Sequence, residues 1–285
     1  MEGFKNFLIL ANESKDTDLV YSHKVEKCLQ DRGMTARVLV GGNYVDIGHI
    51  NKEELSGVDC VIVMGGDGTM LQASHLLTGS DIPMIGVNLG TVGFLTEVIT
   101  DEISEMVERL ISGDFFIEER MMLESTVYRN NEVACENVHA LNDVVLARQT
   151  YLKLIAVKIY LNGRLFDTCE ADGIILSTPT GSTGYNLSAG GPIVTPDARL
   201  IVLTPISPYS HSRHSVVFGA DDKISLEFVA KRKDGDYAGI VSFDGFDDYQ
   251  ISPGDHIDVT SSTDTLKLIR FSTSSVYEVL KKKLT

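Results

Sequence analysis

An apolar run leads directly into a glycine-rich turn and then into a helix between residues 58 and 77. The run is Val58–Met64, the turn at 65–69 reads GGDGT, and helical periodicity extends from Thr69 to Leu77. A strand that is apolar along its whole length is typical of a parallel sheet covered by helices. At the carboxyl end of such a strand, backbone N–H groups and a helix N-terminus can bind phosphate without any positive side chain. The segment therefore predicts an open α/β sheet with an anion site. It is not a Walker loop, because no lysine follows the last glycine.

The first 117 residues repeat this alternation of apolar strands and amphipathic helices. Gly33 follows the first helical pattern directly and is a typical helix-ending residue. The other elements predicted here are strands at Phe7–Leu10, Ala36–Val40 and Ile82–Val87, and helices at Asp18–Arg32 and Asp101–Ile111. The pattern predicts an α/β N-terminal domain with a Rossmann-like parallel sheet.

After about Phe116 the pattern changes to strands separated by turns. The clearest pair is a hairpin, Ile155–Leu161 and Arg164–Cys169, because Asn162-Gly163 suits the positive φ angles of a type I′ turn. The other predicted strands are Met122–Tyr128, Ala140–Leu146, Ile174–Ser177, Leu200–Thr204, Ser215–Phe218, Lys223–Val229, Ala238–Phe243, His256–Thr260 and Thr265–Arg270. This spacing predicts a mostly antiparallel β-sandwich as the C-terminal domain. The predicted domains are residues 1–117, residues 118–270, and a helical tail at 271–285 that packs back on the first domain.

The charge balance excludes one broad class of function. With 25 Lys and Arg against 40 Asp and Glu, the net charge of −15 repels phosphodiester backbones, so we expect no nucleic-acid partner. No apolar run approaches the roughly 20 residues that cross a bilayer, so we expect no membrane partner and a cytoplasmic protein. Four cysteines lack metal-ligand spacing and are expected to be reduced and buried thiols: Cys28, Cys60, Cys135 and Cys169.

Three further motifs accompany the GGDGT turn. They are NLGTVGFL at 88–95, the pair Asn142-Asp143, and TPTGSTGYNLSAGGP at 178–192. With these motifs the chain resembles the NAD kinases over nearly its full length. The GGDGT turn alone is shared with diacylglycerol-type lipid kinases, whereas the stretch at 178–192 is far more specific to the NAD kinases.

The resemblance implies transfer of the terminal phosphoryl group of ATP, or of polyphosphate in some members, to the 2′-hydroxyl of the adenosine ribose of NAD, giving NADP. We expect Asp67 to accept the hydroxyl proton as general base. Backbone N–H groups of Gly66 and Gly68, with Mg²⁺ or another divalent metal, would stabilise the phosphates. Thr69 would cap the helix or donate to a phosphate oxygen. The nucleotide phosphates and water are expected to hold the metal, with no protein ligand.

For the acceptor nucleotide, the resemblance implies a set of polar contacts. Asn142 and Asp143 would bind the ribose and adenine of NAD, and Asp172 would accept from the nicotinamide carboxamide. Tyr185 could also stack on a base. The other expected contacts are Asn88 and Phe94 on the adenosine side, and Thr183, Gly184, Asn186 and Ser188 in the stretch at 178–192.

Several positions depart from the family pattern. Glu170 stands two residues before Asp172, where the family generally has Arg or Lys, so a charge contact to the NAD pyrophosphate would be missing. Lys153 lies near a position that contacts ligand in some relatives, and we expect it to compensate in part. Phe246 replaces a frequent Gln, and Asp143 replaces a frequent Glu that is longer by one methylene group.

Each of these motifs also has a structural interpretation, and two other functions stay open. Asp67 and Asn142-Asp143 could be turn residues bonded to nearby backbone, and Phe94 could be a core residue. A lipid kinase is disfavoured because the chain has no basic amphipathic helix for a membrane surface. A non-catalytic NAD-binding sensor is disfavoured by the intact Asp67. The resemblance further implies a homodimer or homotetramer in which NAD contacts a neighbouring subunit.

Overall fold

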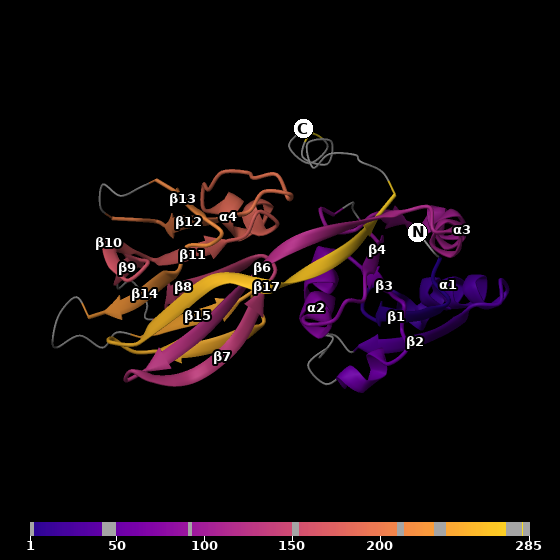
Figure 1. Ribbon diagram of the computed structural model, residues 1–285, viewed down its shortest axis with the longest axis horizontal. Helices are drawn as coiled ribbons and strands as arrows, with labels where there is room; N and C mark the ends of the chain where they lie inside the picture. Colours follow the sequence, from indigo (N-terminus) through magenta and orange to yellow (C-terminus); the bar gives the residue numbers. More distant parts are fainter. Residues whose placement is uncertain are drawn as a thin grey trace. The chain divides into compact units, whose positions relative to one another are not determined.

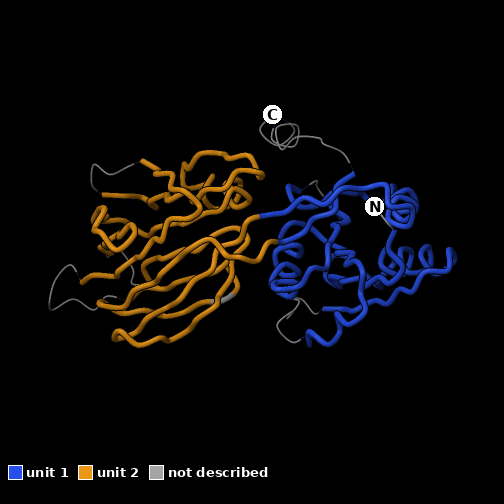
Figure 2. The backbone as a smooth tube through the Cα atoms, in the orientation of Figure 1, with its two compact units in different colours: residues 1–120, 266–285 blue, residues 121–265 orange. Residues whose placement is uncertain are grey.

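The computed structural model describes residues 3–41, 50–90, 93–149, 154–209, 214–230, 238–271 and 281. The chain divides into two units, residues 1–120 with 266–285 (unit 1) and residues 121–265 (unit 2), as Figure 2 shows. It passes from one unit to the other in two long strands, β6 (Phe116–Arg129) and β17 (His256–Arg270). Each of these strands therefore contributes residues to both units.

Unit 1 is an α/β unit built on a parallel sheet (Figure 1). Its strands lie in the order β4-β3-β1-β2, and Leu268 of β17 pairs with Met84 at the free edge of β4. The elements are β1 (Asn6–Asn12), α1 (Val20–Gln30), β2 (Thr35–Gly41), β3 (Cys60–Gly65), α2 (Asp67–Leu77), β4 (Met84–Asn88), β5 (Val98–Ile99) and α3 (Ile103–Ser112). Short 3₁₀ turns occur at Thr17–Leu19, Lys52–Leu55 and Thr100–Glu102.

Both faces of this sheet are buried, as the apolar strands predict. Every residue of β3 is buried, and Ile62 belongs to a core that the sheet shares with α1 and α3 through residues such as Leu29. Side chains alternate along a strand, so Val63 points to the opposite face. α2 covers that face, because a Cβ placed on Gly86, which pairs with Val63, would lie 2.6 Å from the sulfur of Met70.

The elements predicted for residues 1–117 are present, each with boundaries within two residues of the prediction. α1 begins at Val20 instead of Asp18, because Asp18 and Leu19 have positive φ angles of 58° and 56°. The buried carboxylate of Asp16 then caps the helix by accepting hydrogen bonds from the backbone N–H of Tyr21 and Ser22, at 3.0 and 2.8 Å.

Unit 2 is a sandwich of two mostly antiparallel sheets, and the predicted fold classes of both halves are confirmed. One sheet has the order β13-β12-β11-β8-β15-β16, and the other contains β10-β9-β14-β17, with β6 paired to β17 and to β7. Side chains of both sheets, among them Val157 and Leu176, share one core. The remaining elements are β7 (Glu132–Ala140), β8 (Asp143–Arg148), β9 (Ile155–Leu161), β10 (Arg164–Ala171), β11 (Gly173–Ser177), α4 (Tyr185–Ser188), β12 (Leu200–Ile206), β13 (Val216–Gly219), β14 (Ile224–Val229), β15 (Gly239–Phe243) and β16 (Asp247–Ile251).

The hairpin predicted from Asn162-Gly163 is confirmed, since β9 and β10 pair and the two turn residues have φ angles of 50° and 78°. β7 and β16 are strands that the sequence analysis does not predict; β16 is mostly polar, and the apolar residues of β7 are not regularly spaced. The strands predicted at 256–260 and 265–270 are a single strand, β17. The polar residues at 261–264 are typical of a turn, but the chain there stays extended in the sheet.

Three other expectations concern the chain as a whole. The four cysteines are free; Cys60 and Cys169 are buried as expected, whereas Cys28 and Cys135 are only partly buried. Within the described ranges, no helix is both long enough and apolar enough to span a bilayer. The predicted helical tail at 271–285 lies outside the described residues, apart from Phe271 and Lys281.

Candidate functional site

The GGDGT turn joins the end of β3 to the start of α2 in unit 1. Gly66 is extended, with φ −116° and ψ −168°, and its carbonyl oxygen accepts the N–H groups of Thr69 and Met70 at 2.9 and 3.0 Å. A Cβ placed on Gly68 would meet no atom within 4 Å, so the backbone at the first turn of α2 is open to an approaching group. This is the geometry of an anion site at a helix N-terminus.

The side chain of Asp67 is held by the loop that follows β4. Its Oδ2 accepts from the N–H of Phe94 at 2.8 Å, and its Oδ1 accepts from the N–H of Leu95 at 3.0 Å. The loop comes so close that a Cβ placed on Gly93 would lie 1.9 Å from Oδ1. The carboxylate is half-buried, and the two hydrogen bonds fix its direction.

The loop after β1 lies against the GGDGT turn. The amide of Asn12 donates to the hydroxyl of Thr69 at 3.2 Å, and both side chains are buried. The amide oxygen of Asn12 accepts from the N–H of Ser14 at 3.1 Å, which folds the loop back on itself. In this loop Lys15 lies beside Gly66, where a Cβ on the glycine would be 3.1 Å from Nζ. Lys15 therefore brings a positive charge to the candidate anion site.

Asn88 and Phe94 border the loop that holds Asp67. Asn88 is buried, and its side-chain oxygen accepts from the N–H of Gly90 at 2.8 Å. Phe94 is half-buried, and its carbonyl oxygen accepts from Arg270 at 3.3 Å. The guanidinium of Arg270 also pairs with Glu97 at 2.9 Å, so one side chain anchors this loop at two points. Residues 91 and 92 lie outside the described part of the chain.

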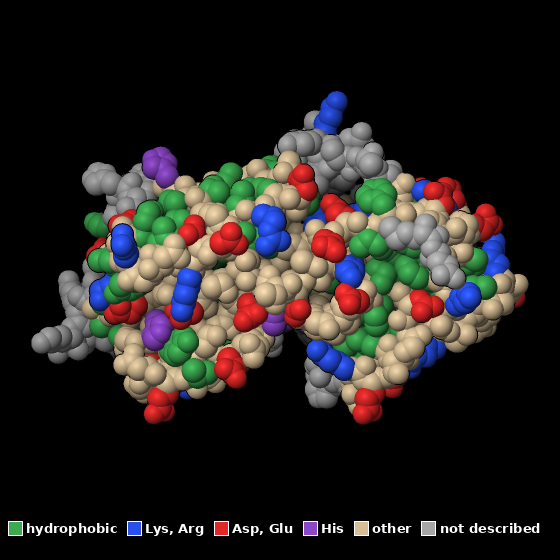
Figure 3. All heavy atoms as spheres, in the orientation of Figure 1, with side chains coloured by type: hydrophobic (Ala, Val, Ile, Leu, Met, Phe, Trp, Pro, Cys, Tyr) green, Lys and Arg blue, Asp and Glu red, His purple; other side chains and the backbone are tan. Residues whose placement is uncertain are grey.

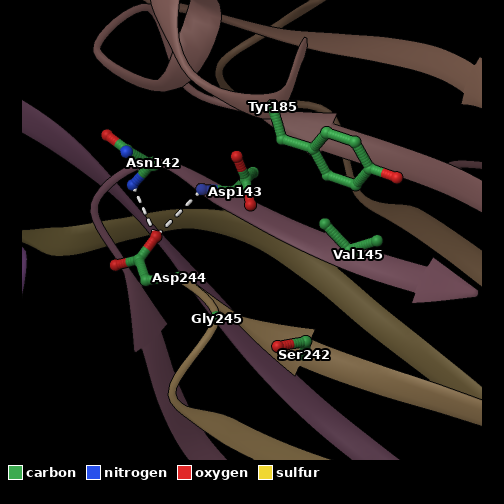
Figure 4. A pocket seen from close by; sticks show the side chains of 7 residues that line it. All are labelled: Asn142, Asp143, Val145, Tyr185, Ser242, Asp244 and Gly245. Carbon is green, nitrogen blue, oxygen red and sulfur yellow. Dashed lines mark hydrogen bonds between the residues drawn. The ribbon is translucent and has the colours of Figure 1, made fainter. Parts of the chain in front are cut away.

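A pocket of about 340 Å³ opens in unit 2 beside the Asn142-Asp143 pair (Figure 4). The ring of Tyr185 lies on one side of it, and Ser242 and Gly245 lie on the other. None of the described residues that line it is cationic; they are Asn142, Asp143, Val145, Tyr185, Ser242, Asp244 and Gly245.

Asp143 is the buried acid of this pocket, with 6% of its surface exposed. It opens β8 and pairs with Ser177 of β11. Burial, and after it the nearby charge of Asp244, raise the pKa of its carboxyl from 3.8 to about 7. Near neutral pH the Asp143 carboxyl can therefore both donate and accept a proton in a hydrogen bond.

The stretch at 178–192 packs closely against the Asn142-Asp143 pair. The Thr178 hydroxyl donates to the carbonyl oxygen of Leu141 at 2.6 Å and accepts from the N–H of Gly181 at 3.0 Å. A Cβ placed on Gly181 would lie 2.1 Å from the carbonyl oxygen of Asn142, so only glycine fits there. Gly184 lies next to the same pair, since its Cβ would be 3.5 Å from the Asn142 amide nitrogen.

Asn186 has an internal role in this stretch. It is fully buried, and its amide nitrogen donates to the carbonyl oxygens of Ser182 and Pro192 at 3.1 and 3.0 Å. Its amide oxygen accepts from the hydroxyl of Thr204 at 2.7 Å. Asn186, which the sequence analysis places among the ligand contacts, thus uses both ends of its amide to fix the loop.

The other expected contacts in unit 2 lie outside the pocket lining. The hydroxyl of Thr183 donates to the carbonyl oxygen of Thr180 at 3.3 Å, and Ser188 is exposed at the end of α4. Asp172 precedes β11, at the opposite end from the stretch at 178–192, and its Oδ1 accepts from Nε of Arg148 at 2.5 Å.

The structure thus places the expected residues in two groups, one around the GGDGT turn in unit 1 and one around the Asn142-Asp143 pocket in unit 2. Of the departures from the family pattern, Glu170 is half-buried in β10 and Phe246 is 41% exposed in the turn between β15 and β16. Lys153, the expected compensating cation, lies outside the described residues, as do residues 210–213.

Comparison with known proteins assigns both halves of the chain. Residues 7–115 match the family model for the ATP-NAD kinase N-terminal domain, and residues 141–271 match the model for the ATP-NAD kinase C-terminal domain. The chain belongs to the NAD kinase family. The NAD kinase of Lachnoclostridium phytofermentans is 39% identical over 98% of both chains, and that of Lachnospira eligens is 38% identical over 98% of this chain and 100% of its own.

Two solved NAD kinase family structures have the same fold. Yeast NADH kinase, complexed with NADH, matches with a TM-score of 0.83 at 21% identity, over 99% of this chain and 88% of its own. The NAD kinase of Archaeoglobus fulgidus, in complex with ATP, matches with a TM-score of 0.78 at 24% identity, over 97% of this chain and 98% of its own.

Three residues that the sequence analysis does not select contact the expected site residues. Lys15 lies beside Gly66, Arg148 donates a hydrogen bond to Asp172, and Asp244 accepts hydrogen bonds from the backbone of the Asn142-Asp143 pair. Lys15 stands in no local motif, and its position depends on the fold of the Asn12 loop. Asp244-Gly245 reads as an ordinary hairpin turn. Arg148 lies six residues after Asn142, and only the pairing of β8 with β11 brings it to Asp172.

Proposed function

We propose that this chain is an NAD kinase that transfers the terminal phosphoryl group of ATP to the 2′-hydroxyl of the adenosine ribose of NAD, giving NADP and ADP. The observation that carries the proposal is the nearly full-length identity of 39% with an NAD kinase, with family models matched in both halves. This also favours an NAD kinase over a lipid kinase, for which the GGDGT turn alone would be the shared feature.

Asp67 is the proposed general base. As the ribose oxygen forms its bond to phosphorus, the carboxylate accepts the hydroxyl proton and the bond from phosphorus to the ADP oxygen breaks. The hydrogen bonds from Phe94 and Leu95 support this role, because they hold the carboxylate in one orientation. Asn88 and Phe94 border the same loop and are proposed to contact the adenosine.

The donor phosphates are proposed to bind at the first turn of α2. The backbone there offers N–H groups and the positive end of the helix dipole, and Gly66 and Gly68 leave room for close approach. Thr69 is held by Asn12 and shapes the turn. Lys15 adds a cationic side chain beside Gly66, which is a means of holding phosphate in a chain with a net charge of −15.

The acceptor NAD is proposed to bind in unit 2, with its adenosine at the pocket of Asn142 and Asp143. Tyr185 offers an exposed aromatic face for a base, and Thr183, Gly184 and Ser188 lie on the same stretch. Asp172, oriented by Arg148, is proposed to accept from the nicotinamide carboxamide. Asn186 contributes by holding the loop.

A divalent metal is proposed to enter with the nucleotide. Within the described ranges, no group of three or more His, Cys, Asp or Glu side chains is arranged to hold a metal ion. The described side chains therefore do not fit a dedicated protein site, and we assign no step to the metal. Mg²⁺ bound by phosphate oxygens and water is the common form in such reactions.

We also propose that the protein self-associates and that it is cytoplasmic. Unit 2 has several exposed hydrophobic side chains, among them Phe166 of β10, Tyr209 and Val217 of β13. Figure 3 shows hydrophobic side chains on the face of unit 2 that carries β12 and β13. An apolar patch of this kind suits a homodimer or homotetramer. Free cysteines are typical of a reducing compartment.

The deciding experiment is an assay of purified protein with ATP, Mg²⁺ and NAD, in which NADP is measured with an NADP-specific dehydrogenase. Diacylglycerol is tested in parallel as acceptor, and NAD binding is measured separately. NADP formation is expected. Binding of NAD without NADP formation would identify a sensor, and phosphorylation of diacylglycerol alone would identify a lipid kinase.

A further inference from the structure

The carboxylate of Asp244 accepts hydrogen bonds from the backbone N–H groups of three successive residues. Its Oδ2 accepts from Leu141 at 2.7 Å, and its Oδ1 accepts from Asn142 at 2.7 Å and from Asp143 at 3.0 Å. The backbone N–H of Asp244 donates in return to the carbonyl oxygen of Asp143 at 3.0 Å. Figure 4 shows the two bonds to Oδ1.

These three N–H groups lie where the chain turns from β7 into β8. A buried N–H without an acceptor costs about 1–3 kcal/mol, so the bend at 141–143 depends on an acceptor from elsewhere. Asp244 comes from the turn after β15, has a positive φ of 53°, and is only 9% exposed. A carboxylate is the strongest acceptor that a side chain can offer to several N–H groups.

This arrangement also brings two acids together in a pocket whose described lining residues include no cation. Asp143 and Asp244 both line it, and among the described lining residues the other titratable one is Tyr185. A residue that served only to close the β15–β16 hairpin would not need a buried charge, because an Asn-Gly turn would do the same.

We propose that Asp244 is the positioning residue for the nucleotide contacts of Asn142 and Asp143: it fixes their backbone and places a negative charge against the Asp143 carboxyl. The proposal rests on the proposed function, in which this pair binds NAD. Burial is the larger cause of the raised pKa of Asp143, about 7, and the charge of Asp244 is the second cause. Asp244 thereby keeps Asp143 able to donate a hydrogen bond to an acceptor atom of the nucleotide at neutral pH.

The test compares wild type with Asp244→Asn, which keeps the shape and removes the charge. The KM for NAD should rise about ten-fold or more, while the KM for ATP changes less than about two-fold. The pH at which kcat/KM for NAD titrates should move to lower pH by about one unit or more, because Asp143 loses the neighbouring charge. Asp248→Asn, an exposed acid on β16, is the matched control and should behave as wild type.

A purely structural Asp244 would lower the melting temperature and leave the pH profile in place, and that result would overturn the proposal. If Asp244→Asn does not fold, amide hydrogen exchange is measured on the wild-type protein instead. The amides of Leu141, Asn142 and Asp143 should be strongly protected, and rapid exchange would refute their hydrogen bonds to Asp244. If wild type makes no NADP, the proposed function fails instead. The ¹³C titration of the Asp143 carboxyl, with and without Asp244→Asn, then tests the inference without turnover.

Discussion

The carboxylate of Asp67 accepts a hydrogen bond of 2.8 Å from the backbone N–H of Phe94, 27 residues further along the chain. The bond ties the first residue of α2 to the loop after β4, and both oxygens of the carboxylate take part because Leu95 donates to the second. Asp67 is therefore both the proposed base and the acceptor that shapes the loop beside it. The predictions below separate these two roles.

Asp67→Asn should lower kcat by about 100-fold to 10,000-fold, the range that a general base contributes. NAD binding should stay within a few-fold of wild type. The amide also turns a donor toward Phe94 or Leu95, which should cost about 1–3 kcal/mol of stability. Kinetics and thermal melting are measured together, with Asp101→Asn, an exposed acid of the same unit, as control. Turnover near the wild-type rate would remove Asp67 as the base.

Gly93→Ala should displace the carboxylate of Asp67 without changing its chemical nature. The new Cβ would lie 1.9 Å from Oδ1 of Asp67, so either the carboxylate or the loop must move. A shift of this size at the reacting group should lower kcat about 100-fold. Gly90→Ala is the matched control, because its Cβ would come no closer than 3.9 Å to Asn88. Equal kinetics for the two variants would contradict the assigned geometry.

Gly68→Ala distinguishes a glycine kept for the fold from one kept for a ligand. A Cβ there would meet no atom within 4 Å, and alanine is favoured over glycine in a helix by about 1 kcal/mol. The melting temperature should therefore stay level or rise. If donor phosphates approach this backbone closely, kcat/KM for ATP should fall about ten-fold or more. Unchanged kinetics would show that the phosphates bind elsewhere.

The sequence predicts the elements of both units because their signals are local. Buried strands such as β3 are apolar throughout, and Asn162-Gly163 carries the turn preference in two residues. β16 is polar and depends on pairing with β15, so no local signal marks it. The same distinction applies to the candidate site. Asp67 stands in a motif. Asp244 has only the sequence signal of a turn residue, and its hydrogen bond with the backbone of Asn142 is evident only in the folded structure.

Asn186 shows that membership in a motif does not define a role. The stretch at 178–192 identifies the family, but burial and hydrogen bonding decide which of its side chains can meet a ligand. Tyr185 is 47% exposed and lines the pocket, while the next residue, Asn186, is fully buried. Neighbours in sequence can therefore have opposite tasks, and only the structure assigns them.

Asn186→Ala should consequently act on stability first. It leaves the Thr204 hydroxyl and the carbonyl oxygens of Ser182 and Pro192 without their partner, which should cost about 2–4 kcal/mol. Urea unfolding measures this loss, and Ser188→Ala, an exposed position on the same stretch, should cost less than about 0.5 kcal/mol. A variant with native stability and weakened NAD binding would instead indicate a direct ligand contact.

Asp143 should make the protein less stable as pH rises through neutrality. Its pKa is about 7 in the folded chain against an ordinary 3.8, so between these values the folded state holds a proton that the unfolded state releases. The stabilising contribution is complete below about pH 4 and is lost as pH rises through about 7.

Asp143→Asn is neutral at every pH and lacks this dependence. Relative to wild type, it should gain about 2–3 kcal/mol in the free energy of unfolding between pH 5 and pH 8. Urea unfolding at the two pH values measures the gain, with Asp248→Asn, an exposed acid, expected to follow wild type. If all three proteins changed equally with pH, the pKa of the buried Asp143 carboxyl would not be raised, and neither burial nor the charge of Asp244 would keep it protonated near neutral pH.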